Sequence, residues 1–336
     1  MTYQLLLQPY QHPFRYPLKT AHGTWDIREG LWVGLQDADG AIGWGEIAPL
    51  PWFGTETVAE ALAYCQQMPT QLSEADIQTI PNHLPASQFG FGSAWEALMS
   101  QSHNASDWPP HCGCALLPTG DKALTAWPNR WNQGYRTFKL KIGVHPIDTE
   151  LAQVRTLAAA LPGGVKLRLD ANGSLTLAQA QRWLDCCDRL PHAPIEYLEQ
   201  PLPPSQLTEM MALSQQFATP LALDESVATL AQLQQIYAQG WRSVVVIKAA
   251  IAGYPQLLRD FLQTHPIDAV FSSVFETEVG RAAALNLAQA FQSPHRAIGF
   301  GTEDIWQHSS VPKLPLEQSQ DKSPAHVPTN SKDGYS

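Results

Sequence analysis

Five charged residues recur at a near-constant interval in the second half of the sequence. Lys141, Asp170, Glu199, Asp224 and Lys248 lie 24 to 29 residues apart, and each ends or directly follows a mostly apolar run. A unit of strand, loop and helix takes roughly 25–30 residues. We therefore expect these side chains at the carboxyl ends of five successive parallel strands, which converge on one mouth if the sheet closes into a barrel.

Asp170, Glu199 and Asp224 are the acidic members of this pattern. Each alone has an ordinary structural explanation, as a turn residue, a helix cap or the residue before a proline turn. Three carboxylates in one partly buried mouth repel one another, however, and a bound divalent cation offsets that cost. Hard oxygen donors without Cys or His favour Mg²⁺, or Mn²⁺ in its place. The three acids together predict a metal site.

Lysines flank the predicted metal site. Lys139 and Lys141 are two residues apart in an expected strand, so their ammonium groups share a face. Near a cation and near each other their charged forms are disfavoured, which brings at least one into the range of a general base. Lys248 follows four β-branched residues and would lie across the barrel from Lys141. A solvent-facing edge strand is the alternative for Lys-x-Lys, but a closed barrel has no edge.

The elements that must position these side chains alternate regularly after residue 111. Apolar runs predict eight strands, at 112–117, 138–142, 167–170, 195–199, 221–224, 244–248, 269–272 and 297–300. Helical spacing predicts helices between them, at 148–161, 177–190, 207–217, 230–239, 254–264 and 279–291. No G-x-G-x-x-G follows the first strand, so we expect an α/β fold in which residues 111–305 form a (β/α)₇β TIM-type barrel.

Residues 1–110 are expected to form an α+β capping domain. Alternation at 3–7, 31–37 and 41–46, with an Asp39-Gly40 turn, predicts an antiparallel sheet, and helical spacing appears at 57–67, 74–82 and 91–99. The aromatic-rich stretches 14–30 and 48–54 are expected to be loops that close over the barrel mouth. A linker is expected at 101–110, and residues 306–336 are expected to be a polar, largely disordered tail.

The composition of the chain limits the classes of partner that it can bind. The chain has 31 acidic and 21 basic residues, a net charge of -10 and no Lys/Arg-rich block, so we expect neither nucleic acid nor membrane as a partner. A small-molecule carboxylate is the expected substrate, bound by a monomer or a homo-oligomer. No basic segment followed by a long apolar one opens the sequence, so we expect a cytoplasmic protein. The five cysteines are expected to be free thiols.

The motifs in this order resemble the enolase superfamily, specifically its muconate-lactonising branch. They are Lys-x-Lys at 139–141, Leu-Asp-Ala-Asn at 169–172, Glu-Gln-Pro at 199–201, Asp-Glu-Ser at 224–226 and Ile-Lys at 247–248. The resemblance implies that Asp170, Glu199 and Asp224 bind Mg²⁺. It also implies that Lys141 is the base and that Lys248 stabilises the enolate and an aromatic product by cation–π contact.

Within that branch, three features most resemble the members that dehydrate a succinyl-substituted cyclohexadiene carboxylate in menaquinone and phylloquinone biosynthesis. They are Lys-Thr-Ala-His-Gly at 19–23, Arg168 two residues before Asp170, and Ser-Ser-Val-Phe-Glu-Thr at 272–277. The implied reaction removes the proton next to the carboxylate and expels the ring hydroxyl as water. The residues expected to bind substrate are Lys139, Arg168, Asn172, Ser272 and Ser273.

Other activities of the branch stay open at this point. The same metal and lysines would serve racemisation of N-succinylamino acids, epimerisation of dipeptides or muconate cycloisomerisation, and a barrel that binds its ligand without turnover is a further alternative. The surroundings favour dehydration. Ser272 and Ser273 can donate to a succinyl carboxylate, and an apolar ring can pack on four aromatic side chains, Phe14, Trp25, Trp52 and Phe53.

Overall fold

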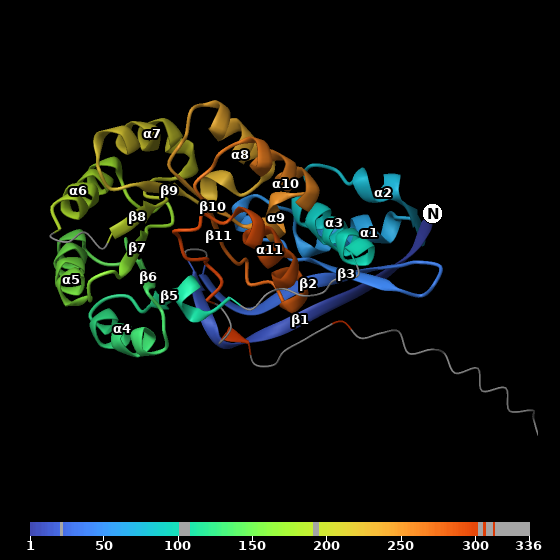
Figure 1. Cartoon of the computed structure of the whole chain (residues 1–336), viewed down its shortest axis with the longest axis horizontal. Helices are drawn as coiled ribbons and strands as arrows, with labels where there is room; N and C mark the ends of the chain where they lie inside the picture. The colour runs from blue at the N-terminus through green and yellow to red at the C-terminus, as the bar shows by residue number, and fades with distance from the viewer. Residues whose placement is uncertain (21–22, 101–107, 191–194, 302–304, 307–311, 313–336) are drawn as a thin grey trace, which may run out of the picture.

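The computed structural model describes residues 1–20, 23–100, 108–190, 195–301, 305–306 and 312. These residues form an antiparallel sheet covered by helices and a curled parallel sheet surrounded by helices, with the antiparallel sheet running past one side of the parallel one (Figure 1). Residues 21–22, most of the predicted linker and most of the predicted tail lie outside the described residues. The domain boundary at residue 110 stays a prediction.

In the N-terminal part, the described residues form one sheet and three α-helices. Its strands are β1 (Thr2–Thr20), β2 (Gly23–Gln36), β3 (Ile42–Ile47) and β4 (Gln71–Ser73), in the order β3-β2-β1-β4, and its helices are α1 (Val58–Gln67), α2 (Glu74–Gln78) and α3 (Pro85–Ser100). Helix α3 packs on β3, and glycines permit the close approach. A Cβ on Gly45 would lie 1.9 Å from the carbonyl oxygen of Gly90. The predicted α+β capping domain is therefore observed as an α+β unit.

The expectation that residues 14–30 form a loop is wrong. They extend β1 and β2 into a long hairpin, paired as far as Thr20 with Gly23, with an irregular register between Pro13 and Leu18. Pro13 and Pro17 interrupt the alternation that marks a strand in the sequence, and the irregular register lets the pairing continue past them. Helix α3 also begins earlier than predicted, at Pro85, a residue suited to the first turn of a helix.

Within the described part of the chain, the parallel sheet contains seven strands in sequence order. They are β5 (Cys114–Leu117), β6 (Thr137–Lys141), β7 (Lys166–Asp170), β8 (Ile195–Glu199), β9 (Leu221–Leu223), β10 (Val244–Ile247) and β11 (Ala269–Phe271). Residues 298 and 299 form the eighth position, because Ile298 donates to the carbonyl of Cys112 (2.8 Å) and Gly299 to that of Phe271 (2.7 Å). The predicted (β/α)₇β barrel is confirmed, and these two bonds close it.

Helices cover the outside of the barrel, and Figure 1 shows α4 to α8 as an arc around the strands. They are α4 (Lys122–Asn132), α5 (Ile147–Ala160), α6 (Leu177–Asp188), α7 (Leu207–Gln216), α8 (Leu230–Ala238), α9 (Ala249–Ala252), α10 (Pro255–Thr264) and α11 (Glu278–Phe291). The sequence reading missed α4, which contains Pro128, and α9, which is only four residues long. No helix in the described part of the chain is long and apolar enough to cross a membrane.

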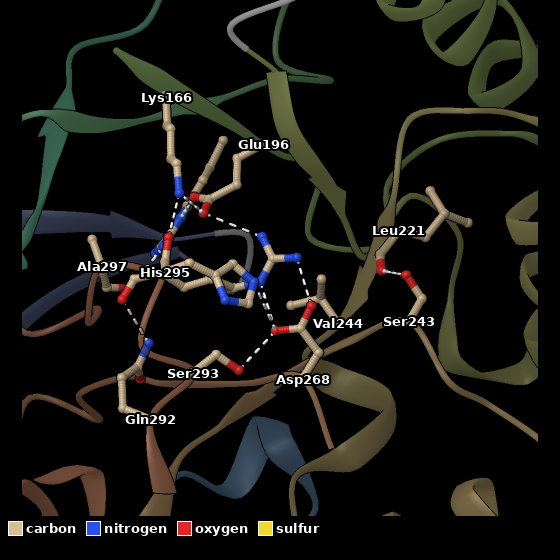
Figure 2. A network of polar contacts seen from close by, with 12 residues as sticks. Lys166, Glu196, Leu221, Ser243, Val244, Asp268, Gln292, Ser293, His295 and Ala297 are labelled. Carbon is tan, nitrogen blue, oxygen red and sulfur yellow. Dashed lines mark hydrogen bonds and ion pairs between the residues drawn. The ribbon is translucent and has the colours of Figure 1, made fainter. Parts of the chain in front are cut away.

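The barrel interior has a small apolar layer between two polar ends. Tyr197, Ala222, Val244, Val246 and Val270 form this layer, separate from the large core shared by strands and outer helices. Figure 2 shows the polar network where the strands begin, with Lys166, Glu196 and Asp268 around one centre. Arg296 donates to both oxygens of Asp268 (2.7 and 2.6 Å) and to Glu196 (3.2 Å). We interpret this amino end as a structural plug.

Candidate active site

A cavity of about 820 Å³ lies at the carboxyl ends of the strands. It is lined by all ten residues that the sequence predicts for the site: Lys139, Lys141, Arg168, Asp170, Asn172, Glu199, Asp224, Lys248, Ser272 and Ser273. Trp25, Trp52 and Phe53 of the N-terminal part line the same cavity. Phe14 lies behind Trp25, with ring centroids 5.0 Å apart, and is buried. Both parts of the fold thus line the cavity.

Strand register explains why the charges converge. Lys141 is paired with Asp170 across β6 and β7, and Asp170 is paired with Glu199 across β7 and β8. Asp224 directly follows β9, and Lys248 directly follows β10. Strands β6 and β10 are separated by β7, β8 and β9, so Lys141 and Lys248 stand on opposite sides of the ring of eight positions.

Two lysines form ion pairs with the three carboxylates. Lys139 Nζ lies 2.7 Å from Asp170 Oδ2 and 2.8 Å from Glu199 Oε1. Lys248 is ion-paired with Asp224, and its Nζ lies 4.4 Å from the centre of the Phe53 ring. Lys141 makes no hydrogen bond or ion pair with the residues that the structure describes. Of the three lysines, Lys141 therefore has the amine that is available to a substrate.

Burial dominates the electrostatics of this mouth. Desolvation raises the pKa of Glu199 to about 7, reinforced by the charge of Asp170 and opposed by that of Lys139. Desolvation likewise raises the pKa of Asp224 to about 6, against the effect of Lys248. For Lys139, burial lowers the pKa, but the surrounding carboxylates raise it well above its usual value. Lys139 thus stays charged and does not meet the expectation for a base.

The donor set fits a hard divalent cation. Asp170, Glu199 and Asp224 supply buried carboxylate oxygens from three neighbouring strands. Among the described residues, no three acidic, His or Cys side chains are already close enough together to hold a metal ion. The ammonium groups of Lys139 and Lys248 lie against the same carboxylates. A metal would therefore bind here in competition with the lysines, with oxygen ligands of the type that Mg²⁺ prefers.

The predicted substrate-binding residues line the cavity with several of their groups already engaged. Arg168 is buried and donates to Glu196 Oε2 (2.6 Å) and to the carbonyl of Ala297 (2.7 Å). Ser272 donates to the carbonyl of Gly299 (3.2 Å), and Ser273 donates to Glu276 (3.0 Å). Their substrate contacts stay predictions, because a hydroxyl that donates to a substrate must first release its present partner.

Asn172 lies at the end of the same mouth and is also engaged. Its backbone N–H donates to Asp170 Oδ1 (3.0 Å), and its side-chain amide donates to Glu225 Oε1 (3.1 Å). Glu225 also lines the cavity and was not predicted, although it adjoins Asp224 in the Asp-Glu-Ser motif. Desolvation raises the pKa of Glu225.

Gln200 is a second residue that the sequence reading did not identify. It is completely buried, with its backbone in the left-handed region at φ 36°. Its side-chain oxygen accepts from the backbone of Asp224 (3.0 Å), and its amide donates to the hydroxyl of Ser226 (2.7 Å). Gln200 therefore ties the end of β8 to the end of β9. Its place in Glu-Gln-Pro, directly after a predicted metal ligand, is the signal that could have indicated this.

Comparisons with known proteins match this architecture in both parts. The family described as "Enolase C-terminal domain-like" matches residues 123–324, and that described as "MenC, N-terminal domain" matches residues 4–98. The o-succinylbenzoate synthase of Thermosynechococcus vestitus is 44% identical over 304 residues, which cover 90% of this chain and 93% of that protein. The o-succinylbenzoate synthase of Pectobacterium atrosepticum is 30% identical over 333 residues, covering 94% and 97%.

Solved structures of o-succinylbenzoate synthase and of its relatives also resemble this chain. The crystal structure of o-succinylbenzoate synthase from Thermosynechococcus elongatus, complexed with Mg in the active site, matches with a TM-score of 0.85 and 42% identity over 93% of this chain and 96% of that one. The dipeptide epimerase of Enterococcus faecalis matches with a TM-score of 0.76, but at 21% identity over 92% of each chain. At that identity the second likeness concerns the fold alone.

Proposed function

Because the chain belongs to the o-succinylbenzoate synthase family of the enolase superfamily, we propose that it is a lyase that dehydrates 2-succinyl-6-hydroxy-2,4-cyclohexadiene-1-carboxylate to 2-succinylbenzoate with Mg²⁺ as cofactor. The observation that carries the proposal is the single cavity lined by the three carboxylates, Lys141 and Lys248 together. Asp170, Glu199 and Asp224 would hold the metal. When bound, Mg²⁺ would fix the substrate carboxylate and increase the acidity of the adjacent C–H.

The two lysines on opposite sides of the cavity divide the chemistry. Lys141 has an amine without a polar partner among the described residues, so it takes the proton from the carbon next to the carboxylate. Lys248 faces the charge that develops on the carboxylate, with its ammonium held by Asp224 and by the Phe53 ring. Lys141 then returns its proton to the departing hydroxyl, which leaves as water. Loss of both groups from one face needs only this one acid/base.

The walls of the cavity support an aromatic product. Trp25, Trp52 and Phe53 line it on the side of the N-terminal part. Lys139 and Arg168 add positive charge near the metal ligands, which suits a dicarboxylate substrate, although both already contact carboxylates of the protein. An N-succinylamino acid racemase or a dipeptide epimerase is the second candidate, since Lys141 and Lys248 could exchange protons on opposite faces of a carbon atom.

The decisive experiment compares three substrate classes on one preparation. We expect kcat/KM for the cyclohexadiene to exceed that for N-succinylamino acids and dipeptides by at least about two orders of magnitude, or roughly 3 kcal/mol of transition-state binding. Ultraviolet absorbance follows aromatisation, and polarimetry follows racemisation. Comparable rates on an N-succinylamino acid would reassign the enzyme as a promiscuous racemase. Absence of turnover with Mg²⁺ on all three would favour a barrel that only binds its ligand.

We also propose a cytoplasmic location, no nucleic-acid or membrane partner, and a capping domain that ends near residue 110. The location is supported by the five cysteines, all of which are free thiols in the structure. The absence of nucleic-acid and anionic membrane partners is supported by the net charge of -10. The boundary is supported by the two matched families, which end at residue 98 and begin at residue 123.

A further inference from the structure

The segment between β11 and α11 lines the cavity but is held from outside the barrel. We refer to residues 272–277 as the β11–α11 loop. Ser272, Ser273 and Phe275 from this loop line the cavity. Two buried charged residues of the N-terminal part, Arg28 on β2 and Glu46 on β3, bind its backbone. Neither Arg28 nor Glu46 is among the described residues that line the cavity.

Arg28 joins two walls of the cavity. Arg28 is only 2% exposed, and its Nε donates to the carbonyl of Phe275 (3.1 Å). Nη1 donates to the carbonyl of Pro49 (2.8 Å), at the start of the segment that carries Trp52 and Phe53. One side chain thus sets the distance between the aromatic wall of the N-terminal part and the wall formed by the β11–α11 loop.

The backbone of Phe275 depends on such contacts. Its φ is 61°, in the left-handed region that residues with a side chain rarely adopt. A residue stays in this region when its surroundings determine its conformation. The ring of Phe275 meets that of Trp25 edge to face, with centroids 5.6 Å apart, and Arg28 holds its carbonyl. Loss of the bond from Arg28 would therefore let Phe275 relax and move this wall.

Glu46 fixes the other end of the β11–α11 loop. It is fully buried and accepts from the backbone N–H groups of Thr277 and Gly280, both at 2.8 Å. The hydroxyls of Tyr10 and Thr277 donate to the same carboxylate. The first turn of α11 is therefore tied to β1 and β3.

We propose that Arg28 and Glu46 are positioning residues that determine substrate preference by holding the β11–α11 loop against the N-terminal part of the chain. This inference rests on the proposed function for the identity of the substrate. In this proposal, two residues that do not line the cavity control the position of one of its walls. Substrate affinity and preference should therefore depend on these residues more than the chemical step does.

The test is Arg28→Met, which keeps the length of the side chain and removes the donors and the charge. We expect KM for the cyclohexadiene to rise about tenfold and its advantage over an N-succinylamino acid to shrink, with kcat changed less than about threefold. The matched control is Arg259→Met. Arg259 contacts Glu96 of α3 (3.0 Å) and so links the same two parts of the fold away from the loop. It should leave KM and preference unchanged.

Hydrogen exchange provides a readout that does not require turnover. In Arg28→Met, and in Glu46→Gln as a second variant, amides of residues 272–280 should exchange faster than in the wild type and in Arg259→Met, while Mg²⁺ affinity is retained. Unchanged exchange in this segment, or KM and kcat altered to the same extent as in Arg259→Met, would overturn the proposal. A wild type that turns over no cyclohexadiene contradicts the proposed function instead, and exchange still decides whether the loop is held.

Discussion

Replacing Lys139 by methionine tests how the mouth balances its charge. Lys139 Nζ lies within 2.8 Å of two carboxylates, Asp170 and Glu199, and the lysine side chain is 21% exposed. Removing one partner of a buried ion pair typically costs 3–5 kcal/mol. Because Lys139 is partly exposed, we expect the lower value, about 3 kcal/mol, for the metal-free protein. At about 2 °C per kcal/mol in a chain of this size, Tm should fall by about 6 °C.

Mg²⁺ should reverse this loss. Lys139 and a metal compete for the same oxygens, so wild-type metal binding must first disturb the lysine contacts. If the metal displaces even half of an interaction worth about 3 kcal/mol, Lys139→Met should bind Mg²⁺ about tenfold more tightly. Saturating Mg²⁺ should then bring the two Tm values closer together.

The assay is calorimetric titration with Mg²⁺ together with thermal unfolding in EDTA and in excess Mg²⁺. Lys122→Met, at the exposed first residue of α4, is the control for loss of a positive charge. If Lys139→Met binds Mg²⁺ no more tightly than the wild type, and Mg²⁺ does not restore its Tm, the reasoning is refuted. Lys139 would then not share its carboxylates with the metal.

Two further predictions concern the lysines and pH. Lys141→Ala should abolish both dehydration and deuterium exchange at the α-carbon of a substrate analogue. Lys248→Ala should keep part of that exchange. Full activity of Lys141→Ala would show that the base is another residue. Because Glu199 and Asp224 have raised pKa values in the metal-free fold, about 7 and 6, the folded state binds more protons than the unfolded one. In EDTA the protein should therefore gain stability as pH falls from about 8 to about 5, and Mg²⁺ should suppress that gain. A flat profile of Tm against pH in EDTA would contradict the raised pKa values of Glu199 and Asp224.

The barrel and its site were predictable because both depend on local periodicity. A strand and helix of ordinary length return the chain to the same end of the sheet, so the interval between Lys141 and Lys248 carries three-dimensional information. The alternation of side chains in a strand likewise placed Lys139 with Lys141 on one face, and both line the cavity. The eighth strand position was predictable as an apolar run, although only its hydrogen bonds to β5 and β11 define it.

Contacts between distant segments were not predictable. The hairpin at residues 14–30 depends on pairing across an irregular register, and Pro13 and Pro17 conceal it in the sequence. From the sequence, the hydroxyls of Ser272 and Ser273 were expected to donate to a substrate. In the folded chain they donate to the carbonyl of Gly299 and to Glu276 instead. Similarly, Gln200 acquires its role only when β8 and β9 lie side by side. Residue type at one position does not indicate which partner will satisfy its polar atoms.

The two polar ends of the barrel are coupled through Glu196. At the amino end this carboxylate accepts from Lys166 (3.4 Å) and Arg296 (3.2 Å), as part of the plug in Figure 2. Its other oxygen accepts from Arg168 (2.6 Å), whose side chain reaches the cavity. The guanidinium of Arg168, which is proposed to bind the substrate, is thus oriented by Glu196 of the plug. Arg168 also donates to the carbonyl of Ala297 (2.7 Å), next to Arg296 in the sequence. A change at the plug should consequently reach the active site through Arg168.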